Sequence, residues 1–282
     1  MSALTTDTLL EGLRFGEGPR WHEGRLWLSD MHSGVVLAVD EDGKSEEIVH
    51  VPAEPSGLGW RPDGTLLIVS MQDRKLVALE DDGSLREVAD LSEHATYHCN
   101  DMVVDAAGRA YVGNFGWDLH GGGKPVAANM ILVDTDDSVR VAATDLSFPN
   151  GTVITPDGST LVVGESFGGR LTAFDVASDG SLSNRRVWAQ LEGAVPDGIC
   201  LDEEGGIWVA SPVSHECLRV LEGGEVTHRV AIEKQAFACM LGGVDGRTLF
   251  ICTAGESDPA KTTVRDGKIE TVRVDAARAG LP

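Results

Sequence analysis

The sequence predicts an all-β fold, a six-bladed β-propeller with four-stranded blades, formed by residues 1–282 as a single domain. Three observations support this prediction. One hairpin pattern occurs six times, further strand-like segments fill the intervals between its copies, and helical periodicity is nearly absent. The copies recur every 40 to 50 residues, which is the length of a four-stranded propeller blade. No linker rich in proline or serine divides the chain, which favours one domain.

Each copy of the hairpin opens on a polar or small residue and continues as a short apolar strand. It then turns at a glycine and ends in a second apolar strand. Residues 150–166, NGTVITPDGSTLVVGES, show the pattern, and their Pro-Asp-Gly sequence is typical of a turn. The copies open at Glu17, Ser56, Asn100, Asn150, Asp197 and Ala238, and their turn glycines are Gly24, Gly64, Gly108, Gly158, Gly205 and Gly246.

The segments between the hairpins are expected to supply the two outer strands of each blade. In residues 34–51, 75–91, 170–189 and 217–232, apolar and polar residues alternate around a turn, which is typical of half-buried strands.

A propeller must also close its ring, because an unpaired strand would leave backbone hydrogen-bonding groups exposed. We expect residues 262–275 to form a hairpin in the sixth blade and residues 6–15 to add the last strand to it.

Composition restricts the partners. The chain has 45 acidic and 23 basic residues, a net charge of −22, so nucleic acid and anionic membrane surfaces would be repelled. The five cysteines are odd in number and form no CxxC motif, which argues against a disulfide framework and fits a reducing cytosol. No signal peptide or membrane-spanning stretch is evident. We expect a cytoplasmic protein that acts on a small molecule, and the sequence gives no indication of its oligomeric state.

The openings of the hairpins are the candidate functional positions, because the innermost strands of a propeller begin near one end of the central tunnel. The resulting ring would hold two carboxylates, Glu17 and Asp197, and two carboxamides, Asn100 and Asn150. Each could be an ordinary turn residue, but their equivalent places in separate repeats favour a shared site. A cation would relieve the repulsion between the carboxylates. All-oxygen ligands favour a hard divalent cation, with calcium expected and magnesium, manganese or zinc as alternatives.

The motifs that carry these residues resemble the SMP-30/gluconolactonase/LRE family, which includes regucalcin. The resemblance rests on GEGPRW, LWLSD, CNDMVVDAAGR, FPNGTVITPDGSTLVVGES, VPDGICLDEEGGIWVA and CMLGGVDGRTLFICTA, and it covers nearly the whole chain. It implies a six-bladed propeller whose divalent cation is held in the tunnel by Glu17, Asn150 and Asp197. It also implies that Asn100 lies beside the metal, where it contacts substrate or a bound water, and that the protein hydrolyses lactones.

The expected reaction is therefore hydrolysis of the ester ring of a small lactone. The cation would polarise the carbonyl, and water would be activated by the metal, by Asp197 as general base, or by both. Glu17 and Asn150 would mainly hold the ion, while Asn100 would orient the carbonyl or the water. Three alternatives stay open: a phosphotriesterase or fluorophosphatase on the same metal site, a non-catalytic calcium-binding propeller and, more remotely, a lyase.

Two features bear on the substrate. In sugar-lactone hydrolysing relatives, an arginine two positions before the Asn of the ND motif reaches substrate hydroxyls, whereas this chain has His98. A neutral histidine offers fewer donors than arginine. Residues 113–125 resemble the variable loop that covers the tunnel mouth, and Phe115 and Trp117 could either pack within the blade or line that mouth, where they would favour an apolar ring. We therefore expect a preference for aliphatic or aromatic lactones over gluconolactone.

Overall fold

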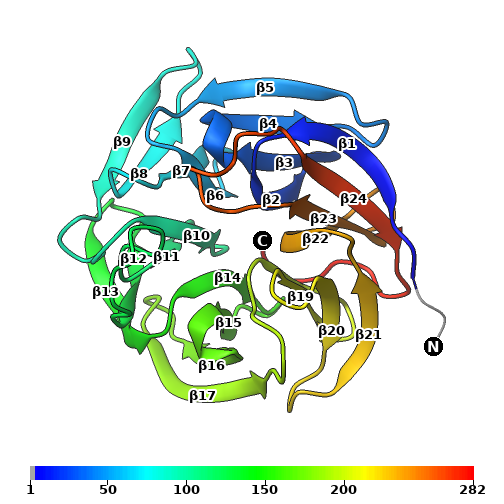
Figure 1. The fold of residues 1–282 in the computed structure, drawn as a ribbon. Coiled ribbons are helices and arrows are strands. Elements are labelled where there is room, and N and C mark those ends of the chain that lie inside the picture. Colours follow the sequence, from blue (N-terminus) through cyan, green and yellow to red (C-terminus); the bar gives the residue numbers. More distant parts are fainter. Residues whose placement is uncertain (1–3) are drawn as a thin grey trace.

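The computed structural model describes residues 4–282. Six four-stranded antiparallel sheets surround a central axis as the blades of a β-propeller, which confirms the predicted fold class (Figure 1). In five blades the strands follow chain order from the innermost to the outermost, and the sixth blade combines both ends of the chain. The described residues include no helix with the length and apolar character needed to cross a membrane.

The first two blades comprise β2 (Gly16–His22), β3 (Arg25–Asp30), β4 (Val35–Val39) and β5 (Ser45–His50), then β6 (Pro55–Trp60), β7 (Leu66–Ser70), β8 (Lys75–Leu79) and β9 (Leu85–Asp90). The next two comprise β10 (Cys99–Val104), β11 (Ala110–Asn114), β12 (Ala128–Val133) and β13 (Val139–Leu146), then β14 (Pro149–Ile154), β15 (Thr160–Glu165), β16 (Arg170–Val176) and β17 (Leu182–Gln190). The last two comprise β18 (Ile199–Leu201), β19 (Ile207–Ser211), β20 (Glu216–Val220) and β21 (Val226–Ala231), then β22 (Gln235–Gly242), β23 (Thr248–Ala254), β24 (Gly267–Arg273) and β1 (Asp7–Leu13).

The ring closes where β1 pairs antiparallel with β24 and becomes the outermost strand of the sixth blade. The prediction that residues 6–15 complete this blade is confirmed. The hairpin predicted for residues 262–275 is wrong, because β24 already has β23 on one side and β1 on the other. The residues before β24 instead form a turn, in which the backbone N–H groups of Lys261 and Thr262 donate to the carbonyl oxygen of Asp258.

The innermost strands of neighbouring blades approach one another so closely that some positions admit only glycine. A Cβ atom at Gly151 would lie 2.4 Å from the backbone nitrogen of Ile199, and one at Gly198 would lie 2.5 Å from the Cβ of Ala238. Both distances are shorter than real contacts allow. The close approach therefore explains the glycines that follow Asn150 and Asp197. The N–H of Gly151 donates to the carbonyl oxygen of Asp197 at 3.2 Å.

The pairing of the innermost strand with its neighbour is irregular in five of the six blades. The register shifts lie between Glu17 and Arg20, Pro55 and Leu58, Cys99 and Met102, Pro149 and Thr152, and Ala236 and Ala238. Such bulges re-aim side chains next to active sites. In the remaining blade, Asp197 comes just before the short strand β18. The hairpin openings thus occupy irregular backbone at one end of the tunnel.

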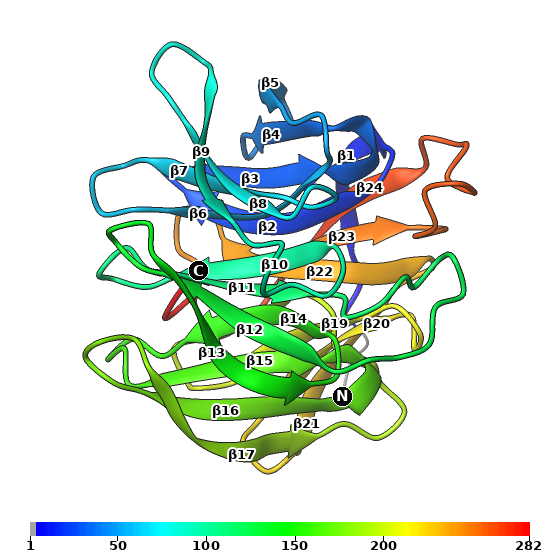
Figure 2. The same cartoon turned by 90° about the vertical axis from the view of Figure 1, so that its left-hand side faces the viewer.

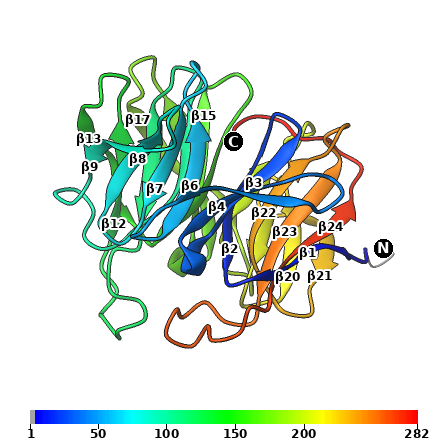
Figure 3. The same ribbon diagram turned by 90° about the horizontal axis from the view of Figure 1, so that it is seen from above.

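Two long connections project from the same end of the molecule, β11–β12 in residues 115–127 and β23–β24 in residues 255–266 (Figures 2 and 3). They flank the tunnel mouth on two sides. Both contribute side chains to the cavity described next, including Asp118, His120 and Ser257.

Candidate active site

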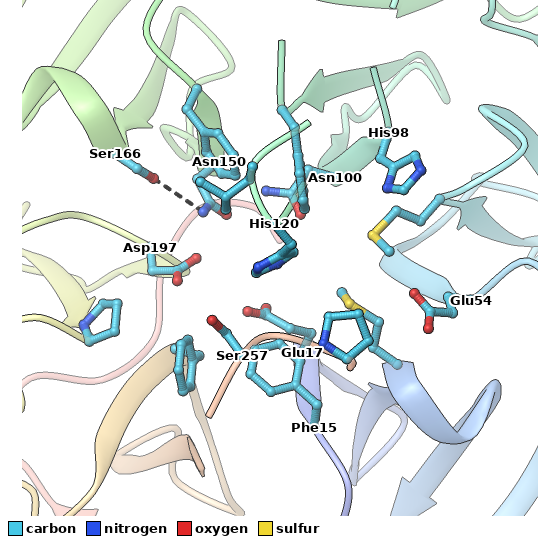
Figure 4. A pocket seen from close by; sticks show the side chains of 18 of the residues that line it. Phe15, Glu17, Glu54, His98, Asn100, His120, Asn150, Ser166, Asp197 and Ser257 are labelled. Carbon is cyan, nitrogen blue, oxygen red and sulfur yellow. Dashed lines mark hydrogen bonds between the residues drawn. The ribbon is translucent and has the colours of Figure 1, made fainter. Parts of the chain in front are cut away.

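A cavity of about 360 Å³ lies at this end of the tunnel, and residues from all six blades line it. The predicted residues Glu17, His98, Asn100, Asn150, Asp197 and Phe115 are among them. Figure 4 shows Glu17, Asn150 and Asp197 converging on one side of the cavity, with Asn100 nearby. Each of these four side chains comes from a different blade, so only the closed ring brings them together.

Hydrogen bonds fix the orientation of the Asn150 side chain. Its Nδ2 donates to Oγ of Ser166 at 3.2 Å (Figure 4). That hydroxyl donates in turn to the carbonyl oxygen of Pro196 at 2.7 Å. This chain of bonds assigns the amide nitrogen of Asn150 and leaves its Oδ1 available as a ligand. Ser166 is therefore a positioning residue for Asn150, and the sequence prediction did not include it.

The two carboxylates lie in an environment that disfavours their charged forms. Burial raises the pKa of Asp197 to about 8, and the nearby Asn150 amide opposes only part of the rise. Burial, followed by the negative charge of Asp197, raises the pKa of Glu17 well above its usual range. The backbone N–H of Gly18 donates to Oε2 of Glu17 at 3.0 Å, which offsets this rise in part.

This donor set fits a divalent cation. A bound cation would stabilise the charged forms of these two buried carboxylates, and Asn150 adds a neutral oxygen. Residues 4–282 contain no group of three or more His, Cys, Asp or Glu arranged to hold a metal ion. Glu17, Asn150 and Asp197 are thus the residues that could hold it.

Arg20 offsets the rise in the pKa of Glu17 only as the smallest of the contributions, and it is itself paired with Asp101. Its Nη2 donates to Oδ1 of Asp101 at 2.5 Å and to the carbonyl oxygen of Met102 at 2.6 Å, and its Nε donates to Leu58 O at 2.9 Å. Arg20 and Asp101 thereby join the innermost strands of three blades, β2, β6 and β10. Next to them, Oδ1 of Asn100 accepts a long hydrogen bond from Oγ of Ser56, at 3.4 Å.

Besides Asn100, three residues were predicted to contact substrate, and the structure places them differently. His98 lines the cavity and stacks on Tyr97 with ring centroids 4.1 Å apart, and burial lowers its pKa. Phe115 also lines the cavity and packs 4.6 Å from Phe148. Trp117 is not among the lining residues; it packs edge-on against Phe148 and Phe167, which do line the cavity. These contacts place Trp117 in the packing around Phe148 and Phe167, and its contact with substrate stays a prediction.

The sequence prediction missed several lining residues. Phe15, Phe148 and Phe237 form much of an apolar wall, together with Met31 and Met71. Phe15 and Phe148 lie just before the hairpin openings Glu17 and Asn150, so their offset from those positions could have indicated them.

Glu54 and His32 are two further polar lining residues that the prediction missed. Glu54 follows β5, the outermost strand of the first blade, and His32 follows β3, the second strand of that blade. Both lie outside the hairpin pattern, so the repeats do not indicate them.

Comparisons with known proteins agree with the observed fold. A family model described as SMP-30/Gluconolactonase/LRE-like region matches residues 15–255. A pentonolactonase of Haloferax volcanii is 28% identical over 286 residues, covering 95% of this chain and 93% of that protein. Among solved structures, a luciferin-regenerating enzyme has a TM-score of 0.84 at 20% identity, covering 99% of this chain and 98% of that one. A calcium-binding protein, regucalcin, from Agrobacterium tumefaciens has a TM-score of 0.83 at 22% identity, covering 99% and 97%. These two structural similarities show the fold.

Proposed function

The chain belongs to the SMP-30/gluconolactonase/LRE-like family, and from this premise we propose that it is a divalent-metal-dependent lactonase. One observation carries the proposal. Two buried carboxylates and an oriented carboxamide, Glu17, Asp197 and Asn150, converge in a cavity large enough for a small ring. The pentonolactonase relative supports lactone hydrolysis, and the regucalcin described as calcium-binding supports calcium as the ion.

Each residue of the site has a separate role in the proposed reaction. A bound divalent cation would polarise the lactone carbonyl and increase the acidity of a nearby water. Glu17 and Asn150 hold the ion position, and Asn100 orients the carbonyl or the water. Asp197 accepts the proton of the attacking water at a carboxylate oxygen and can return it to the leaving alkoxide as the ring opens.

Asp197 can act as this base only when its carboxyl group is ionised. Burial raises its pKa to about 8, which disfavours the ionised form at neutral pH. A positive charge beside it would lower that pKa. The cation would therefore favour the ionised form of Asp197, and that carboxylate would in turn be a ligand of the cation.

The walls of the cavity support a substrate with an apolar body. Phe15, Phe115, Phe148 and Phe237 line the cavity, and the neutral His98 offers only one donor and one acceptor. The pentonolactonase relative points instead to sugar lactones. Comparing kcat/KM for gluconolactone with values for γ-butyrolactone derivatives and dihydrocoumarin tests the preference, and a clear advantage for gluconolactone would contradict it.

Removal of the metal tests the proposed activity itself. Lactone hydrolysis should disappear in EDTA and return when calcium, or another divalent ion, is added in excess. A protein that hydrolyses no lactone with any of these ions, yet loses much of its thermal stability in EDTA, would be a calcium-binding propeller. Hydrolysis of phosphotriesters in preference to lactones would favour the alternative hydrolase.

A further inference from the structure

A second polar cluster in the cavity, formed by Glu54 and His32, takes no part in the chemistry above. Glu54 lies in the connection between β5 and β6, and His32 lies in the 3-10 turn η1 (Met31–Ser33) after β3. Both residues line the cavity. Figure 4 shows the Glu54 carboxylate on the side of His98, across the cavity from Asp197. The cluster is therefore placed to contact a part of a bound molecule that lies away from the reacting carbonyl.

Each side chain has one buried polar atom whose hydrogen-bonding capacity is unused. The exposed fraction of the side chain is 4% for His32 and 15% for Glu54. Within residues 4–282, neither Nδ1 of His32 nor Oε2 of Glu54 has a hydrogen-bond partner, and Nδ1 lies 3.5 Å from Oε1 of Glu54. Buried polar atoms without partners are costly, so a ligand is expected to satisfy them.

The neighbours of His32 define what the pair offers to a ligand. Its Nε2 lies 3.1 Å from the carbonyl oxygen of Ser257, an acceptor, so Nε2 carries the proton. Its ring stacks on Phe15 with centroids 4.8 Å apart, which holds the ring in place. In the neutral ring Nδ1 is then an acceptor beside an acceptor carboxylate. The pair is complementary to a hydrogen-bond donor.

The backbone holds Glu54 in an unfavourable conformation. Its φ is +64°, in the left-handed region that few residues other than glycine adopt. Two hydrogen bonds fix this conformation: the N–H of Glu54 donates to Val51 O at 3.1 Å, and the N–H of Met71 donates to Glu54 O at 2.9 Å. Such strain concentrates at binding sites, where the surrounding structure enforces it. A glycine would fit this backbone without strain, so the conformation does not account for a glutamate here.

We propose that Glu54, supported by His32, binds a hydroxyl group of the substrate, so that the preferred lactone carries a hydroxyl on an otherwise apolar body. This inference rests on the proposed lactonase function and names its substrate class. A hydroxyl donates to the carboxylate, whereas an alkyl group of equal size displaces water and leaves the carboxylate unsatisfied. Sites built to bind a hydroxyl reject the analogue that lacks it far more strongly than apolar pockets reject an extra methyl group.

Matched pairs of ligands test this discrimination. The pairs are γ-butyrolactones with a 3-hydroxy or 3-methyl, a 4-hydroxy or 4-methyl, and a 5-hydroxymethyl or 5-ethyl substituent, and the corresponding pyrrolidin-2-ones. The lactones report kcat/KM, and the lactams, which resist hydrolysis, report binding by titration calorimetry. In at least one pair, the wild-type protein should favour the hydroxylated member by about tenfold or more in both measurements.

Two substitutions of Glu54 and one control assign the effect. Glu54→Gly should lower the hydroxyl-to-alkyl ratio of that pair by about tenfold while keeping the backbone conformation. Glu54→Gln keeps the size of the side chain and a neutral acceptor, so it should lower the ratio by less. Glu23→Gly is the matched control, because Glu23 also has a positive φ (+48°) but lies in a turn with its side chain 81% exposed. It should leave the ratio unchanged.

The two measurements separate the inference from the proposed function. Lactam discrimination that depends on Glu54, without hydrolysis of any lactone, would retain the hydroxyl site and reject the lactonase proposal. Hydrolysis with ratios near one in every pair would reject the hydroxyl site, as would a ratio that neither Glu54 substitution changes.

Discussion

At the scale of single residues, burial sets the properties of Asp197. The side chain lies at the tunnel end of its blade, and burial raises its pKa to about 8. Its backbone is also fixed, since its N–H donates to Ala210 O at 3.0 Å and its carbonyl oxygen accepts from Gly151. Substitution of the carboxyl group can therefore test its chemistry with little change in its position.

Asp197→Asn should separate proton transfer from metal binding. The amide retains an oxygen ligand but cannot accept a proton from water, so we predict a fall in kcat of about 100-fold or more, the usual scale for loss of a general base. Calcium affinity, measured by titration calorimetry, should fall by a smaller factor. Turnover near the wild-type value in a variant shown to bind calcium would exclude Asp197 as the base.

Glu165 is a second buried carboxylate, and it has a structural role. It ends β15 and accepts hydrogen bonds from Arg170, Thr172 and the backbone N–H of Ser147, at 2.9, 2.5 and 2.8 Å respectively. These bonds and the charge of Arg170 lower its pKa despite its burial. The bond to Ser147 fixes the chain that leads to Asn150. Asp30 at the end of β3 acts in the same way, accepting the N–H groups of Arg14 and Phe15 at 2.9 Å.

Glu165→Gln should therefore reduce stability in a pH-dependent way. Because the folded-state pKa of Glu165 is lowered, its ionised form stabilises the fold above the unfolded-state pKa, and this contribution is lost as the pH falls through the folded-state value. We predict a loss of about 1 to 3 kcal/mol in the free energy of unfolding at pH 7, shrinking as the pH falls below about 4.

Urea unfolding of both proteins across this pH range measures the difference. Glu80→Gln is the control, because Glu80 pairs with Arg86 on the surface, where about half of each side chain is exposed, and such pairs contribute little. A loss at Glu165 that is as small as at Glu80, or that does not depend on pH, would contradict the assigned role.

At the scale of elements, the innermost strands determine the site. Their bulges turn Asn100 and Asn150 toward the tunnel, and glycines allow neighbouring blades to approach. At Gly151 this approach sets the position of Asp197 relative to Asn150, because Gly151 packs directly against the backbone around Asp197.

Gly151→Ala should damage both stability and activity. The added methyl group would lie 2.6 Å from the carbonyl oxygen of Asp197, so the two blades must move apart. We predict a loss of about 1 to 3 kcal/mol in the free energy of unfolding, together with weaker calcium binding and lower kcat/KM. Gly158→Ala in the β14–β15 turn is the control, since it has open space around it and only its positive φ (+71°) to strain. It should cost stability without changing calcium affinity, and an equal loss of calcium affinity in both variants would contradict the prediction.

The sequence predicted the innermost strands better than the irregularities of their backbone. Repeated hairpins place a polar or small residue near the start of each innermost strand, and that spacing predicted that Glu17, Asn100, Asn150 and Asp197 lie near one another. It could not predict the bulges, because an extra residue in a strand leaves no pattern in a short apolar run. Nor could it predict Glu54, since Glu-Pro gives no indication of a left-handed backbone that turns a carboxylate into the cavity.

At the scale of the whole molecule, the ring depends on contacts between the two ends of the chain. Leu13, in β1, is 3% exposed and packs in a core that also includes Leu28, Cys252 and Ile269 from the first and sixth blades. The six-fold repeat predicted this closure. Residues 262–275 were wrongly predicted to form a hairpin because the alternation of apolar residues continues into a turn. That all residues form one cooperative domain stays a prediction.

Leu13→Ala tests closure and cooperativity together. Removing a buried leucine side chain at the joining strand should lower the free energy of unfolding by about 2 to 5 kcal/mol. If the ring is one cooperative unit, the whole molecule should unfold at the lower urea concentration, and far-UV circular dichroism and tryptophan fluorescence should give coincident transitions. Val244→Ala, at a site 93% exposed in the same blade, should leave the midpoint unchanged. Separate transitions in Leu13→Ala, with the sixth blade unfolding before the rest, would mean that the blades are held together less by closure than by contacts between neighbours.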